Sequence, residues 1–278
     1  MANIPRVLTI AGSAAGGSAG IQADLKTFQE FDVYGMSVVT AIVSRHPQTD
    51  KNVHPISIEA IEAQLHTANI QTGIDSLKTG MLFSKEVIET VAHFIKEHDF
   101  PHVVVDPVMV GKLKSKLLKE DAIRALKETL IPLATIITPN MVEASILLDD
   151  RPIQTVADIQ QAALDLYALS AKHVLVKGGR LDGPAVDVLY DGKELTTFHA
   201  PRIETNNTSG AGCTYSAAIA ALLGKGLRTK EAVYEAKKFV TTAIEHSFSY
   251  HAAVGPTYHA ANRKYGEAHT IEVTTEKR

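Results

Sequence analysis

The sequence has little of what marks an extracellular or a nucleic-acid-binding protein. Among its 278 residues there is one cysteine, Cys213, and no tryptophan. A single thiol cannot close an intramolecular disulfide, and it cannot by itself hold a structural zinc ion, which takes about four ligands. The formal net charge is −3, with both signs intermixed, so we expect no basic surface and no nucleic-acid partner.

Long apolar runs are also absent. The longest purely apolar run, residues 217–223, is far shorter than the roughly 20 residues that cross a bilayer. The first residues carry neither the apolar stretch nor the cleavage site of a secretory signal. We therefore expect a cytoplasmic protein with no membrane partner. A hydrophobic content of 45% with 21% charged residues is typical of a globular protein with a sizeable core.

Short β-branched runs alternate with longer segments of helical period, which predicts βαβ units around a mostly parallel sheet. The expected strands are residues 6–11, 36–43, 76–79, 102–105, 135–137, 173–176 and 186–189. The expected helices are residues 19–31, 58–72, 85–97, 120–130 and 229–246. Asp191 and Gly192 suit a tight turn between strand-like runs 186–190 and 194–199, so an antiparallel edge is expected. No repeat or linker interrupts the chain, which predicts one domain over residues 1–278.

The first glycine-rich stretch, residues 12–20, follows an expected strand and opens an expected helix. This context suits a loop that binds a phosphate or a small substrate. The stretch lacks the Lys and Ser/Thr of a Walker loop and the spacing of a dinucleotide fingerprint. A plain strand-to-helix turn therefore remains an equal interpretation.

A second glycine-rich stretch, Gly210, Ala211, Gly212 and Cys213, precedes an apolar helix expected to begin near Thr214. Unobstructed N–H groups at a helix N-terminus can form an anion hole for a phosphoryl group. The same dipole stabilises a thiolate, so we expect the pKa of Cys213 to fall below the free value of roughly 8.5. A buried structural thiol in a helix cap is the alternative.

Polar residues that suit metal or phosphate binding follow two other expected strands. Asn140 and Glu143 lie three apart at a helix start, where they can hold a hydrated Mg²⁺ between nucleotide phosphates. They also fit an ordinary N-cap and capping box. Asp106 follows the expected strand 102–105 and precedes a segment that suits a lid. Its alternative is a turn residue before Pro107.

Taken in order, eight motifs run through nearly the whole chain: AGSxxGGSAGIQADLKTFQE, YGMxxxTAIV, KTGM, DPVMVxK, TPNxxEA, VLVKGG, NTSGAGCTYSAAIAA and VGPTYH. Their joint occurrence resembles the hydroxymethylpyrimidine (phosphate) kinase and pyridoxal kinase group of the ribokinase-like superfamily. The VGPTYHAA ending and the KTFQE and YGM patterns are closer to the bacterial pyridoxal kinases that resemble the pyrimidine kinase. The resemblance implies an α/β, ribokinase-like single domain with a mixed central sheet, flanking helices and a lid loop. It also implies ATP, Mg²⁺, a small heteroaromatic alcohol as substrate, and a homodimer.

The resemblance also assigns roles to matching positions. The implied catalytic residues are Gly210, Ala211, Gly212, Cys213 and Asp106, with Cys213 where sugar kinases carry a catalytic Asp. The implied nucleotide contacts are Lys112, Asn140, Lys177, Gly179 and Thr208, and the implied metal ligands are Glu143, Asp106 and Asn140. The implied substrate pocket contains Gly12, Ala14, Val43, Arg45, Met81 and Val108.

The departures from the family pattern gather at this pocket. Ala14 replaces an Asp, Arg45 stands where a Gln or Met occurs, Gly111 replaces a lid Cys, and Ser209 replaces a His. The leading hypothesis is a kinase of pyridoxal, pyridoxine or pyridoxamine. Hydroxymethylpyrimidine/phosphomethylpyrimidine kinase of thiamine biosynthesis, alone or as a second activity, is the alternative. A non-catalytic vitamin-binding protein on the same fold is the rival from another class, and a sugar kinase is disfavoured because no Asp follows GAG.

Overall fold

The structure is a computed structural model that describes residues 1–278 except 1–3, 45–47, 49–51, 112–116, 251–253 and 267–268. Its described part forms one sheet of ten strands in the order β10-β9-β8-β7-β6-β5-β4-β1-β2-β3. The strands are β1 Arg6–Ala14, β2 Tyr34–Val43, β3 Val53–Pro55, β4 Ser76–Thr79, β5 Val103–Val105, β6 Ile136–Ile137, β7 Val174–Gly178, β8 Ala185–Tyr190, β9 Glu194–Ala200 and β10 Glu272–Lys277.

The centre of the sheet is parallel and its edges are antiparallel. Strands β2, β1, β4, β5, β6 and β7 run parallel, whereas β3 at one edge and β8, β9 and β10 at the other pair antiparallel. Parallel strands are buried on both faces and therefore read as continuous apolar runs. The run Val103–Val105, wholly buried, is an example. The predicted mixed, mostly parallel sheet is confirmed.

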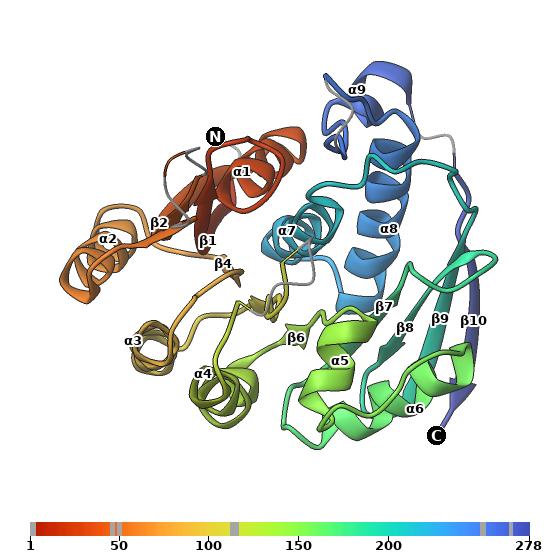
Figure 1. Ribbon diagram of the computed structural model, residues 1–278, viewed down its shortest axis with the longest axis horizontal. Helices are drawn as coiled ribbons and strands as arrows, with labels where there is room; N and C mark the ends of the chain where they lie inside the picture. Colours follow the sequence, from red (N-terminus) through yellow and green to blue (C-terminus); the bar gives the residue numbers. More distant parts are fainter. Residues whose placement is uncertain (1–3, 45–47, 49–51, 112–116, 251–253, 267–268) are drawn as a thin grey trace.

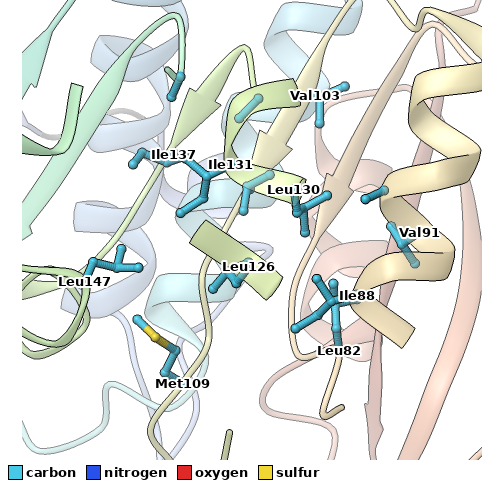
Figure 2. Packing of buried hydrophobic residues seen from close by; sticks show 14 of the residues in the cluster. Leu82, Ile88, Val91, Val103, Met109, Leu126, Leu130, Ile131, Ile137 and Leu147 are labelled. Carbon is cyan, nitrogen blue, oxygen red and sulfur yellow. The ribbon is translucent and has the colours of Figure 1, made fainter. Parts of the chain in front are cut away.

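Helices cover both faces of the sheet (Figure 1). They are α1 Ile21–Glu30, α2 Ile58–Gln71, α3 Lys85–His98, α4 Glu120–Ala125, α5 Met141–Leu147, α6 Val156–Tyr167, α7 Ala211–Gly224, α8 Thr229–Glu245 and α9 Ala261–Tyr265. One buried apolar cluster packs the helices from α2 through α6 against the sheet. Figure 2 shows its centre, where Leu126 and Leu130 face Ile88. A second cluster joins α1, α7 and α8 to the opposite face. No helix in the described ranges is long and apolar enough to span a membrane.

Several predicted boundaries need correction. The segment 120–130 is not one α-helix, because α4 ends at Ala125 and a π-helical turn, Leu126–Leu130, follows it. Pro132 lies two residues after the end of this turn, and its ring and missing N–H oppose a regular helix through it. The predicted hairpin of β8 and β9 is confirmed, but β10 pairs outside it and forms the actual edge. Strand β10 is exposed along its whole length, so its sequence carries no buried face to reveal it.

Candidate active site

A cavity of about 1790 Å³ opens at the carboxyl ends of the parallel strands. This is where open α/β sheets bind ligands. Every predicted site residue that the structure describes lines it: Gly12, Ala14, Val43, Met81, Asp106, Val108, Asn140, Glu143, Lys177, Gly179, Thr208, Gly210, Ala211, Gly212 and Cys213. Arg45 and Lys112 lie outside the described residues.

Two glycine-rich loops meet at the start of α7. Gly210 is the N-cap, with φ of 83°, and a Cβ placed on it would lie 1.7 Å from the Ser18 carbonyl oxygen. Only glycine fits there, because other residues rarely adopt that φ and the backbone of the first loop leaves no room. The Ser209 hydroxyl donates to the Ser18 hydroxyl at 2.8 Å. The first glycine-rich stretch is therefore part of the cavity wall as well as a strand-to-helix turn.

The start of α7 presents free donors. The helix begins at Ala211, three residues earlier than predicted. In the described part of the chain, the Gly212 and Cys213 N–H groups donate to no backbone carbonyl, as expected in a first helical turn. A Cβ on Gly212 would lie 3.5 Å from the Lys177 ammonium. Unobstructed amides and a cation thus converge on the same region, which suits a transferring phosphoryl group.

Cys213 does not behave as its helix position predicts. Its side chain is half-buried, and its sulfur accepts a hydrogen bond from the Gly20 N–H at 3.4 Å. Burial raises the pKa of the Cys213 thiol, and the nearby Lys78 ammonium opposes that rise without cancelling it. The predicted fall in pKa was wrong, because loss of solvation on burial is the largest influence on this thiol.

Asp106 is the centre of a buried network and not a simple turn residue. It is 3% exposed. One carboxylate oxygen lies 3.0 Å from the Lys177 ammonium and accepts from the Thr138 hydroxyl, while the other accepts from the Ser216 hydroxyl on α7. Its oxygens are thus already paired. Asp106 holds Lys177 beside the start of α7.

Asn140 and Glu143 form a reciprocal capping box at the start of α5. The Asn140 side-chain oxygen accepts from the N–H groups of Val142 and Glu143 at 2.9 and 3.1 Å. The Glu143 carboxylate accepts from the Asn140 N–H at 2.9 Å. Burial raises the pKa of Glu143 to about 8, although the Lys177 charge opposes this. Asn140 and Glu143 therefore form the N-cap and capping box that the sequence also allowed.

The side chains of the cavity fit a magnesium ion only if nucleotide phosphates supply the remaining ligands. Among the described residues, no group of three or more His, Cys, Asp or Glu side chains is placed to hold a metal. Mg²⁺ in kinases is usually held by one or two carboxylates together with substrate phosphates. Glu143 and Asp106 line the cavity and match the one or two carboxylates of such a site.

Apolar residues line another part of the cavity. A Cβ on Gly12 would lie 2.5 Å from the Met81 methyl and 3.7 Å from a Val43 methyl, so these three residues meet. The Ala14 N–H donates to the Gln22 side chain at 2.9 Å. These apolar residues and Cys213 line the same cavity.

Sequence reasoning did not single out several charged residues in or beside the cavity, among them Lys78, Asp24 and Arg202. Lys78, on β4, pairs with the buried Asp24 of α1. Arg202 donates to the carbonyls of Gly179, Leu181 and Gly183, and so holds the loop after β7. A lysine inside the short buried strand 76–79 was the signal available for Lys78, since an unpaired lysine is rarely buried.

Comparison with known proteins identifies the family. The family model for phosphomethylpyrimidine kinase matches residues 15–258. The chain belongs to this family. It is 48% identical over 262 residues to the pyridoxine kinase of Bacillus subtilis, covering 93% of this chain and 97% of that protein. It is 40% identical over 264 residues to the hydroxymethylpyrimidine/phosphomethylpyrimidine kinase of the same organism, covering 94% and 97%.

Solved structures agree with this assignment. The pyridoxal kinase from Staphylococcus aureus in complex with AMP-PCP and pyridoxal superimposes with a TM-score of 0.90 at 37% identity, covering 99% of this chain and 100% of that one. The ADP complex of Bacillus subtilis pyridoxal kinase gives a TM-score of 0.88 at 47% identity, covering 94% and 100%. The ribokinase-like α/β fold expected from the motifs is confirmed.

Proposed function

We propose that this chain is an ATP-dependent kinase that phosphorylates the hydroxymethyl group of a B6 vitamer: pyridoxal, pyridoxine or pyridoxamine. One observation carries the proposal. A single cavity contains a helix start with free N–H donors, two buried lysines that pair with Asp106 and Asp24, the thiol of Cys213, and an apolar part formed by Gly12, Val43 and Met81. Such a cavity accepts a nucleotide and a flat alcohol together. The Staphylococcus aureus relative binds an ATP analogue and pyridoxal at once.

The residues divide the work of phosphoryl transfer. The Gly212 and Cys213 amides and the Lys177 ammonium stabilise the charge that develops on the phosphoryl group. Asp106 holds Lys177 in place. Cys213 lies at the junction of the two ends and receives the proton of the attacking hydroxyl. Glu143, with Asp106, is the site for a nucleotide-bound Mg²⁺, which supplies charge neutralisation when present.

Hydroxymethylpyrimidine kinase activity is the second candidate. The family model and the Bacillus subtilis relative of 40% identity favour it. The 48% identity to a pyridoxine kinase places the B6 vitamer first. A non-catalytic vitamin-binding role is opposed by the intact set of Asp106, Lys177, Glu143 and the Gly210–Cys213 segment. Homodimer assembly and a cytoplasmic location stay predictions, and light scattering on the purified protein tests the first.

A coupled ADP-release assay tests the function. Mg-ATP is supplied with pyridoxal, pyridoxine, pyridoxamine, hydroxymethylpyrimidine or hydroxymethylpyrimidine phosphate. We expect turnover with all three B6 vitamers. Turnover only with the pyrimidines would transfer the assignment to the second candidate. Tight vitamer binding by calorimetry without any ADP release would support the non-catalytic role instead.

A further inference from the structure

The cavity wall at the end of β1 departs from regular sheet pairing. The register of β1 against β2 shifts between Ala11 and Ser13. Gly12 lies at this shift and lines the cavity. Ala14 and Val43 are paired in the shifted register, and both line the cavity too. A register shift leaves backbone groups without their regular partners and often occurs beside active sites, so other groups must hold this segment.

Gln22, the second residue of α1, holds the end of β1 with both polar atoms of its side chain. Its side-chain oxygen accepts a hydrogen bond from the Ala14 N–H at 2.9 Å, and its side-chain nitrogen donates to the Ser13 hydroxyl at 2.7 Å. The Ala14 carbonyl accepts from the Gly17 N–H at 2.8 Å. Both backbone polar groups of Ala14 are therefore engaged within the protein.

Gln22 acts on the cavity from behind its wall. It is not among the residues that line the cavity. One backbone contact ties the following loop to β2, because the Ala15 N–H donates to the Val43 carbonyl at 3.0 Å. Within the described part of the chain, the Ala14 N–H has Gln22 as its only acceptor. Gln22 can therefore influence a bound substrate only through Ser13 and Ala14.

We infer that Gln22 is a positioning residue that keeps Gly12, Ala14 and Val43 in the arrangement that binds the vitamer. The inference rests on the proposed kinase function, which places the vitamer against these three residues. Without the two side-chain hydrogen bonds, the end of β1 occupies other conformations for part of the time. The apparent dissociation constant of a ligand rises as its binding-competent state becomes less populated. Saturating vitamer restores that state, so the loss falls on vitamer affinity and not on the rate of transfer.

Calorimetric binding of pyridoxine to the free protein tests the inference. Pyridoxine is the probe because it has no aldehyde that could react with lysines. Gln22→Met keeps nearly the same side-chain length and removes both hydrogen bonds. Its dissociation constant for pyridoxine should rise at least about tenfold, the scale of one or two hydrogen bonds of ordinary net strength, and that for AMP-PCP should stay at the parent value. Unchanged pyridoxine affinity in folded Gln22→Met would overturn the inference.

Two further substitutions separate positioning from a general loss of stability. Gln22→Glu keeps oxygens that can accept from the Ala14 N–H and the Ser13 hydroxyl, so it should recover most of the affinity. Gln29→Met makes the same exchange at an exposed position of the same helix, and it should leave both affinities unchanged. Urea unfolding measures the stability of each variant. Equal loss of affinity for pyridoxine and AMP-PCP in Gln22→Met would reduce Gln22 to a structural role.

Ser13→Ala decides if Gln22→Met does not fold. It removes one of the two side-chain hydrogen bonds of Gln22 and leaves the bond to the Ala14 N–H. The dissociation constant for pyridoxine should rise by about threefold, the effect of one weak hydrogen bond. An unchanged value in this variant would contradict the inference.

Kinetics separate this inference from the proposed function. In the ADP-release assay Gln22→Met should raise KM for pyridoxine at least about tenfold, while kcat and KM for ATP stay near the parent values. A parent protein that binds pyridoxine but releases no ADP would overturn the proposed function and leave the binding result standing. An active parent protein whose Gln22→Met variant keeps its KM for pyridoxine would overturn the inference alone. A parent protein that binds no pyridoxine would overturn both.

Discussion

At the scale of single residues, burial decides the protonation of the site. Both Cys213 and Glu143 hold their protons more tightly than they would in water, and burial is the first cause for each. The lysines Lys78 and Lys177 oppose this effect. Chemistry in the cavity therefore depends on how closely each buried acid is matched by a cation.

Removal of the thiol is the first test at this scale. Cys213→Ala should lower kcat by at least about two orders of magnitude, because general-base assistance is typically worth about 10² to 10⁴ in rate. The KM for the vitamer should change little, since the apolar end of the cavity is untouched. Steady-state kinetics measure both values. Full activity in Cys213→Ala would reduce Cys213 to a structural thiol and leave catalysis to the amides and Lys177.

The two interpretations of Glu143 are separated by Glu143→Gln. The amide oxygen of Gln can still accept from the Asn140 N–H, so the capping box and the thermal midpoint should be nearly kept. A nucleotide-bound Mg²⁺ favours the ionised carboxylate of Glu143 against its pKa of about 8, and Gln cannot supply that charge. We expect activity at limiting Mg²⁺ to fall by about tenfold or more, the effect of losing over 1.4 kcal/mol, while vitamer binding by calorimetry is retained. Unchanged activity at limiting Mg²⁺ would show that Glu143 serves only in the capping box of α5.

At the scale of elements, the start of α7 is where fold and chemistry coincide. Its N-cap contacts the first glycine-rich loop, and its fourth residue, Thr214, contacts the buried His259 beyond α8. Segments distant in sequence thus hold one helix end in place. Substitutions at the start of α7 should therefore affect either the stability of the fold or nucleotide binding, depending on the position.

Two glycines of this element make a matched pair. Gly210→Ala should destabilise the fold by roughly 1 to 3 kcal/mol, because the residue has a positive φ and its Cβ would strike the Ser18 carbonyl. Gly212→Ala meets no backbone clash, only the Lys177 ammonium at 3.5 Å, so it should fold normally and raise KM for ATP. Urea unfolding and steady-state kinetics measure the two effects. Equal loss of stability in both variants would contradict the distinction.

His259 predicts a pH dependence of folding. It is 6% exposed, and burial lowers its pKa from 6.5 to about 4. A histidine with a depressed pKa binds more protons when unfolded, so its contribution to stability is complete above about pH 6.5 and is lost as the pH falls toward 4. Between pH 7 and 5 the loss should be roughly 2 kcal/mol. Urea unfolding at both pH values should show a smaller difference for His259→Gln, and an identical difference would contradict this role.

At the scale of the whole molecule, the sheet gathers its loops at one edge. The segments after β1, β4, β5, β6 and β7 all line the cavity, because parallel strands place their carboxyl ends together. We therefore expect nucleotide and vitamer to share this cavity, and substrate choice to depend on the residues that differ from the family pattern, of which Ala14 lines the cavity.

Substrate preference follows from those differences. Ala14 has no polar group to replace an Asp, and Arg45 offers donors but no acceptor for an aminopyrimidine, which a Gln both donates to and accepts from. We expect a higher kcat/KM for a B6 vitamer than for hydroxymethylpyrimidine. Competition of the two substrates at fixed Mg-ATP, with products separated by chromatography, measures the ratio. As a control, Arg45→Gln should move the ratio toward the pyrimidine, and equal or better turnover of the pyrimidine by the parent protein would contradict the preference.

Much of the order of elements was readable from the sequence, although β3, α6, α9 and β10 were not predicted. Apolar β-branched runs marked the buried strands, and the first glycine-rich stretch, Asp106 and Asn140 directly followed such runs, which identified these residues as site candidates. Local patterns are sufficient for this because strand burial and loop position depend on neighbouring residues. The exposed strand β10 left no such pattern and was missed.

Only the tertiary structure decided the electrostatics. The pKa of Cys213 depends on burial and on Lys78, Asp24 and Asp106, which come from three other elements. A local rule, the helix dipole, predicted the wrong direction for it. The pairing of Asp106 with Lys177 became visible only with coordinates. The sequence had left the capping box of Asn140 and Glu143 as one of two interpretations, and the coordinates show that it forms. Charge interactions act through space and grow stronger as water is excluded, so their outcome depends on which distant segments the fold brings together.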